Sequence, residues 1–86
     1  MSEENNKMRE ELTEERILDM LENRQYKELK EELENNMYPV DLADILEEFV
    51  QKHMVMVFRL LAKDEAEETI TYLNSEMREV LVNGLT

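Results

Sequence analysis

Two short acid-rich stretches hold the side chains of this sequence that are best suited to chemistry. Four carboxylates fall between residues 41 and 48, and four more between residues 64 and 68. No Lys or Arg follows them until Lys52 and Arg78 respectively, so neither stretch has the base one helical turn later that often offsets an acid. Carboxylate oxygens are the ligands that hard cations such as Mg²⁺ accept, usually with several waters retained. The pattern therefore predicts weak cation binding, with these candidate metal ligands: Asp41, Asp44, Glu47, Glu48, Asp64, Glu65, Glu67 and Glu68.

An ordinary solvated surface is the alternative interpretation of either stretch taken alone, because acids also keep small domains soluble. The whole chain has 22 acidic and 10 basic residues, a net charge of −12. A field of that sign repels phosphate backbones and anionic lipid, and it favours cations or basic partner surfaces. We therefore expect no nucleic-acid partner.

The residues needed for catalysis are scarce. There is no Cys, so disulfides, thiolate metal sites and Cys nucleophiles are excluded. His53 is the only histidine, and a lone His beside Lys52 is expected to be a surface or boundary residue. No glycine-rich phosphate loop, G-x-S-x-G elbow, H-E-x-x-H motif or calcium-binding loop is present. We predict that the protein is not an enzyme, and that it has no cofactor beyond a weakly bound cation such as Mg²⁺.

The elements that must position the acids are helices. One Gly and one Pro in 86 residues argue against an all-β protein, whereas the abundant Glu, Lys, Leu and Met favour helix. The longest apolar run, residues 54–58, is too short to span a membrane, and the polar, acidic start is unlike a signal peptide. We expect one all-α domain over residues 12–86, in the cytoplasm and with no direct membrane insertion, preceded by a flexible acidic lead-in over residues 1–11.

Six helices are predicted from caps and apolar spacing. Thr13 is expected to cap the first helix, which ends near Asn23, and the second covers about residues 25–34. Pro39 suits the first turn of the third, and the fourth covers about residues 52–61. The fifth helix is predicted to start with a capping box of Asp64 and Glu67. The sixth is predicted to be capped by Asn74 or Ser75 and to stop at Gly84.

The apolar pattern repeats with a period of about 24 residues. The spacing of Leu42, Ile45, Leu46 and Phe49, typical of a buried helix face, recurs as Ala66, Thr69, Ile70 and Leu73. Two further sets of apolar residues recur at about the same distance, although less regularly. Together the repeats predict three helical hairpins. Such units stack into a solenoid, and we favour a short superhelix over an ordinary helical bundle.

The order of residues over 38–49, 57–68 and 72–76 closely resembles the N-terminal cytosolic domain of MgtE-family magnesium transporters. These stretches are Tyr-Pro-Val-Asp-Leu-Ala-Asp-Ile-Leu-Glu-Glu-Phe, Val-Phe-Arg-Leu-Leu-Ala-Lys-Asp-Glu-Ala-Glu-Glu and Tyr-Leu-Asn-Ser-Glu. The resemblance covers about residues 13–86. The chain departs from the family at Ala62, where Pro is frequent, and at Asn74, where Asp is frequent. The flagellar motor switch protein has a related helical repeat but matches less closely around residues 62–66.

This resemblance implies a right-handed superhelix that belongs to a longer chain. In the family, the N domain precedes paired CBS domains and a transmembrane pore, and the whole protein is a homodimer with these parts on the cytoplasmic side of the membrane. High Mg²⁺ bridges acidic surfaces of the N and CBS domains and closes the pore. The expected function is therefore Mg²⁺ sensing. The alternative is a freestanding α-solenoid module that binds a basic partner.

Overall fold

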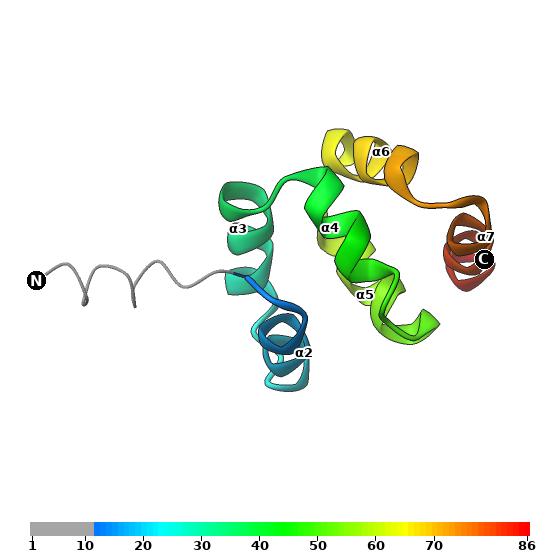
Figure 1. Ribbon diagram of the computed structural model, residues 1–86. Coiled ribbons are helices and arrows are strands. Elements are labelled where there is room, and N and C mark those ends of the chain that lie inside the picture. Colours follow the sequence, from blue (N-terminus) through cyan, green and yellow to red (C-terminus); the bar gives the residue numbers. More distant parts are fainter. Residues whose placement is uncertain (1–11) are drawn as a thin grey trace, which may run out of the picture.

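A computed structural model describes residues 12–86, and six α-helices form this part of the chain (Figure 1). The predicted lead-in over residues 1–11 lies outside the described residues. No strand occurs within residues 12–86, so the all-α prediction with six helices is confirmed. The helices are α2 (Glu14–Glu22), α3 (Tyr26–Asn36), α4 (Pro39–Leu46), α5 (Gln51–Leu60), α6 (Lys63–Tyr72) and α7 (Ser75–Leu85).

Three of the predicted helix starts are confirmed by the local geometry. The Thr13 hydroxyl oxygen accepts a hydrogen bond from the Arg16 N–H at 3.2 Å, which satisfies one of the free donors at the start of α2. The Asn74 side-chain oxygen accepts from the Met77 N–H at 2.8 Å and caps α7 in the same way. Pro39 is the first residue of α4, where its missing N–H has no cost.

The predicted start of α6 is wrong. Ala62, with φ −64° and ψ 156°, is the extended residue before the helix, and no side chain caps α6. Asp64 already lies inside the first turn, so it cannot form a capping box with Glu67. Its charge still favours the helix start through the dipole.

The predicted stop at Gly84 is also wrong, because α7 continues through this residue to Leu85. A Cβ placed on Gly84 would lie 2.6 Å from Val55 Cγ2 and 3.0 Å from Gln51 Cγ. Gly84 therefore allows α7 to approach α5 closely. A hydrogen bond of 2.8 Å from Gln51 Nε2 to the Val80 carbonyl joins the same two helices.

The helices pack as stacked hairpins. α4 packs on α6 and α5 packs on α7, while α2 contacts α3 and α5. In this arrangement the hairpin of α4 and α5 lies against the hairpin of α6 and α7. The first helix of one hairpin packs on the first helix of the next, and the second helix packs on the second. The described part is elongated, with extents of 46 × 24 × 21 Å. The right-handed superhelix remains a prediction.

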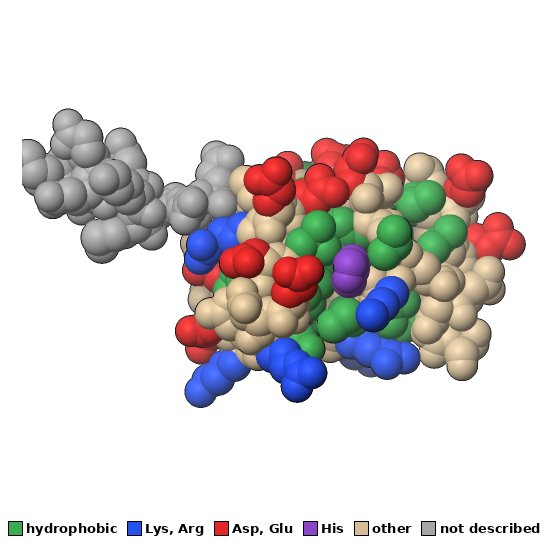
Figure 2. Space-filling view, turned by 90° about the horizontal axis from the view of Figure 1, so that it is seen from below, with side chains coloured by type: hydrophobic (Ala, Val, Ile, Leu, Met, Phe, Trp, Pro, Cys, Tyr) green, Lys and Arg blue, Asp and Glu red, His purple; other side chains and the backbone are tan. Residues whose placement is uncertain are grey.

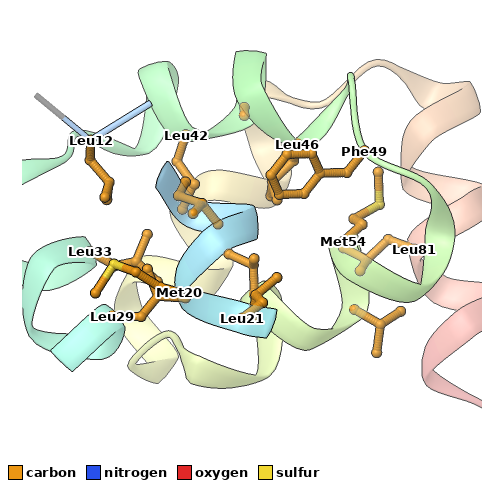
Figure 3. Close-up of a cluster of buried hydrophobic side chains, with 14 of the residues drawn as sticks. Leu12, Met20, Leu21, Leu29, Leu33, Leu42, Leu46, Phe49, Met54 and Leu81 are labelled. Carbon is orange, nitrogen blue, oxygen red and sulfur yellow. The ribbon is translucent and has the colours of Figure 1, made fainter. Parts of the chain in front are cut away.

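One continuous apolar core runs through all the hairpins, and Figure 3 shows part of it. Burial of these side chains is the main force that holds the helices together. Nowhere in residues 12–86 is there a helix with the length and apolar character needed to cross a membrane. The core side chains exposed by no more than 2% are Ile17, Leu29, Leu33, Leu42, Ala43, Leu46, Met54, Val57, Leu73 and Leu81.

Candidate cation site

The acids of the first stretch are divided between a helix and the turn after it. Asp41 and Asp44 are exposed on α4, on the side away from the buried Leu42, Ala43 and Leu46. Because α4 ends at Leu46, Glu47 and Glu48 lie in the following turn, Glu47 half-buried and Glu48 exposed. The four carboxylates therefore do not lie on one helix face.

The acids of the second stretch all lie on α6. Asp64, Glu67 and Glu68 are exposed, whereas Glu65 is half-buried. The Oε1 atom of Glu65 is shielded from solvent and accepts no hydrogen bond from any described residue. A buried carboxylate oxygen without a partner is costly, and a cation or a donor beside it would lower that cost.

Glu65 and Glu68 line a hollow of about 400 Å³ between α6 and the junction of α3 with α4. Glu34, near the end of α3, contributes a third carboxylate to the wall. The remaining lining residues are the polar residues at the end of α3, Asn35 and Asn36, and the residues that lead into α4, Met37, Tyr38 and Pro39. This hollow has three acids and no base in its wall, so it is the place in residues 12–86 where the predicted site residues are best arranged for a cation.

Asp41 lines a second hollow, of about 620 Å³, together with Glu14 from the start of α2. Its other lining residues include the apolar Leu12, Met37 and Ile45. With two acids in a larger and more apolar wall, this hollow is the weaker candidate. The other predicted ligands line neither hollow: Asp44, Glu47, Glu48, Asp64 and Glu67.

No three His, Asp or Glu side chains within residues 12–86 come close enough together to hold a bare metal ion. In this conformation the described side chains therefore do not form a complete set of direct ligands for a metal ion. The arrangement suits a hydrated cation, because Mg²⁺ gives up its waters reluctantly and is often held by only one or two carboxylates.

Charge is segregated on the surface. α4 and the turn after it hold four acids and no base, whereas α5 holds Lys52 and Arg59 and no acid. On the face drawn in Figure 2, Asp and Glu lie mostly along the upper edge and left end, and Lys and Arg mostly along the lower edge. The histidine lies among hydrophobic side chains on this face, half-buried, with its ring edge-to-face with Phe49 at 6.4 Å, as expected for a boundary residue.

Glu34 was not among the ligands predicted from the sequence. Its helix contains both acids and bases, and Glu34 lies 31 positions before Glu65 in the sequence. Only the packing of the hairpins brings the end of α3 to α6. An acid near the end of one helix, just before the turn that leads to Pro39, was the available signal.

These features define an acidic domain of stacked helical hairpins with carboxylates gathered at a hairpin junction. The family model described as "MgtE intracellular N domain" matches residues 37–86, which is more than half of the chain. The chain therefore belongs to this family, the N-terminal domains of MgtE-type magnesium transporters. No curated protein matches the chain, and no solved structure does.

Proposed function

We propose that this chain is the Mg²⁺-sensing regulatory domain of a magnesium transporter. In this proposal it lies on the cytoplasmic side of the membrane, in a homodimer whose chains also carry CBS domains and a transmembrane pore. It has no catalytic role. The observation that carries the proposal is the hollow lined by Glu34, Glu65 and Glu68, with no Lys or Arg among its lining residues, in a chain of the MgtE family.

The physical basis is repulsion that a cation removes. Carboxylates that outnumber the bases beside them repel one another and any second acidic surface brought near them. A hydrated Mg²⁺ between such surfaces turns that repulsion into attraction, so closure against the CBS domains follows the Mg²⁺ concentration. The affinity of the domain alone is modest because the acids do not converge into a complete ligand set. A weak site is what release at low Mg²⁺ requires.

The test is a Mg²⁺ titration of the ¹⁵N-labelled chain, followed by NMR at ionic strength held constant with NaCl. We expect amide shifts concentrated at Glu34, Glu65 and Glu68. The variant Glu68→Gln should weaken the response about two- to fivefold, because one of three charges in the hollow is lost. Glu67→Gln is the matched control, since Glu67 is exposed on the same helix but does not line the hollow.

Equal responses of the two variants, or shifts spread evenly over all acids, would overturn the assignment of the site. A second titration, on a protein that carries this chain together with its CBS pair, tests the closure. There we expect the hollow to become protected from hydrogen exchange as Mg²⁺ rises. Protection that does not depend on Mg²⁺ would refute the switch.

A further inference from the structure

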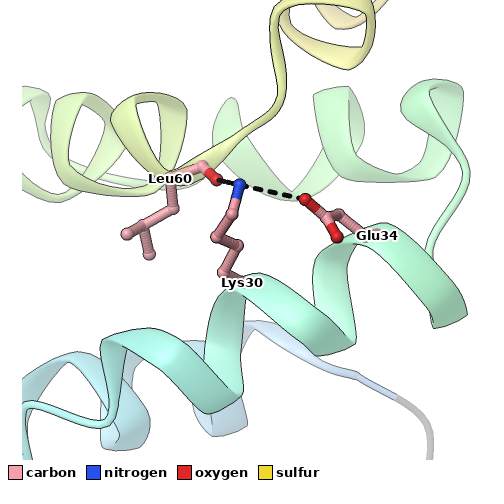
Figure 4. A network of polar contacts seen from close by, with 3 residues as sticks. All are labelled: Lys30, Glu34 and Leu60. Atoms are coloured by element: carbon pink, nitrogen blue, oxygen red, sulfur yellow. Dashed lines mark hydrogen bonds and ion pairs between the residues drawn. The ribbon is translucent and has the colours of Figure 1, made fainter.

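Lys30 of α3 makes two contacts that lie beside the acidic hollow. Its Nζ is 2.9 Å from Glu34 Oε2 and donates a hydrogen bond of 3.1 Å to the Leu60 carbonyl oxygen (Figure 4). Leu60 is the last residue of α5, so its carbonyl belongs to the group that a helix leaves without an intrahelical donor. The ammonium therefore ties α3 to the negative end of α5.

Glu34 is shared between this tie and the hollow. One of its oxygens pairs with Lys30, and the residue also lines the hollow together with Glu65 and Glu68. The Lys30 ammonium is thus a cation, tethered to the protein, at the edge of a site that would otherwise take a dissolved cation. Both partners of the pair are partly exposed, 46% for Lys30 and 36% for Glu34, so the pair is weak enough to be displaced.

We propose that Lys30 competes with Mg²⁺ for Glu34 and thereby couples the hollow to the contact between α3 and α5. This inference rests on the proposed function, since it needs Mg²⁺ in the hollow. A Mg²⁺ ion there draws the Glu34 carboxylate away from Lys30 and weakens the tie to Leu60. By thermodynamic reciprocity, weakening Lys30 strengthens the binding of Mg²⁺.

The Lys30 contacts join two hairpins. α3 belongs to the first and α5 to the second, so the Lys30 tie is a link between successive units of the stack. Glu65 and Glu68 belong to the third. Occupancy of the hollow consequently affects the joints among all three hairpins, not only the local carboxylates.

The experiment compares Lys30→Met with Lys27→Met. Both remove one positive charge from α3 and both introduce a good helix former. The Lys27 side chain is exposed one turn earlier and makes no hydrogen bond or ion pair with any described residue. The probe is MgCl2 at ionic strength held constant with NaCl, and the readouts are the apparent Kd from the Glu65 and Glu68 amides and the ¹⁵N shift of Leu61. The Leu61 amide shares its peptide unit with the Leu60 carbonyl and reports the bond from Lys30.

We expect Lys30→Met to lower the apparent Kd for Mg²⁺ roughly two- to fivefold relative to Lys27→Met, a ratio of the size that surface ion pairs give. In the unsubstituted chain, Mg²⁺ should move the Leu61 signal toward its position in Lys30→Met, and in that variant the signal should not move. Equal Kd values for the two variants would overturn the coupling while leaving Mg²⁺ sensing intact. Absence of any selective Mg²⁺ response in the unsubstituted chain would overturn both proposals.

Discussion

At the scale of the residue, Arg24 has an unusual backbone. Its φ of 59° makes it the one non-glycine residue within residues 12–86 that adopts a left-handed conformation. The Gln25 N–H donates to the Met20 carbonyl and the Arg24 N–H to the Leu21 carbonyl, at 2.9 Å and 3.1 Å. This is the hydrogen-bond pattern of a Schellman motif, in which the left-handed position normally holds Gly. The turn between α2 and α3 is therefore made at a steric cost.

Arg24→Gly is predicted to stabilise the domain. Relief of the left-handed strain gains about 1–2 kcal/mol, and the greater freedom of Gly in the unfolded chain takes back about 0.5–1 kcal/mol. Arg24→Ala is the matched control, because it removes the same side chain but keeps the strain. Chemical denaturation should give Arg24→Gly a free energy of unfolding about 1 kcal/mol above that of Arg24→Ala. Equal values would contradict this account of the turn.

Single residues were predicted well where the signal is local. Thr13 and Asn74 cap the helices that follow them because a side-chain oxygen three residues before a backbone N–H is enough to define a cap. Asp64 was misassigned because the helix begins at Lys63, two residues earlier than a cap at Asp64 implies, after an Ala that carries no cap signal. The contact of Lys30 with Leu60 joins residues far apart in sequence, so no local pattern could reveal it.

At the scale of the element, apolar spacing located all six helices, but it did not give their packing. Leu42, Leu46 and Phe49 are buried as the period predicts, although α4 itself ends at Leu46. Gly84 was expected to end a helix, a role that needs only local freedom. Its position against Val55 depends instead on how α7 packs on α5, which the sequence of either helix alone does not specify.

Gly84→Ala is predicted to destabilise the contact between α5 and α7. The new methyl group would meet Val55 Cγ2 at 2.6 Å, and a β-branched side chain in a helix has little freedom to move away. Overpacking of this kind costs about 1–3 kcal/mol, and the better helix propensity of Ala returns about 1 kcal/mol. We expect a net loss of about 1 kcal/mol in the free energy of unfolding, measured by urea denaturation.

The double variant Val55→Ala with Gly84→Ala tests the cause of that loss. Removing the Val55 methyl groups makes room for the new Cβ, so the double variant should lose at least about 0.5 kcal/mol less than the sum of the two single variants. Strict additivity would mean that Gly84 acts through something other than its approach to Val55.

At the scale of the whole molecule, the stability of the fold depends on a modest apolar core, which favours folding, and on a large negative charge, which opposes it. Residues 12–86 carry most of the chain's net charge of −12, and the elongated stack of hairpins that they form spreads this charge over a length of 46 Å. The segregation of acids from bases leaves repulsion concentrated at α6 and around α4. Cations that bind there stabilise the folded state, so stability itself reports on the site.

The most direct test of Mg²⁺ sensing is the thermal unfolding midpoint, Tm, in MgCl2 and in NaCl at the same ionic strength. A specific site adds about 1.4 kcal/mol of stability when free Mg²⁺ is ten times its Kd, which raises the Tm of a domain of this size by roughly 5–10 °C. We predict that this excess over NaCl is present in the unsubstituted chain and in Glu67→Gln, and that it is reduced in Glu68→Gln. Identical Tm values in the two salts would contradict it.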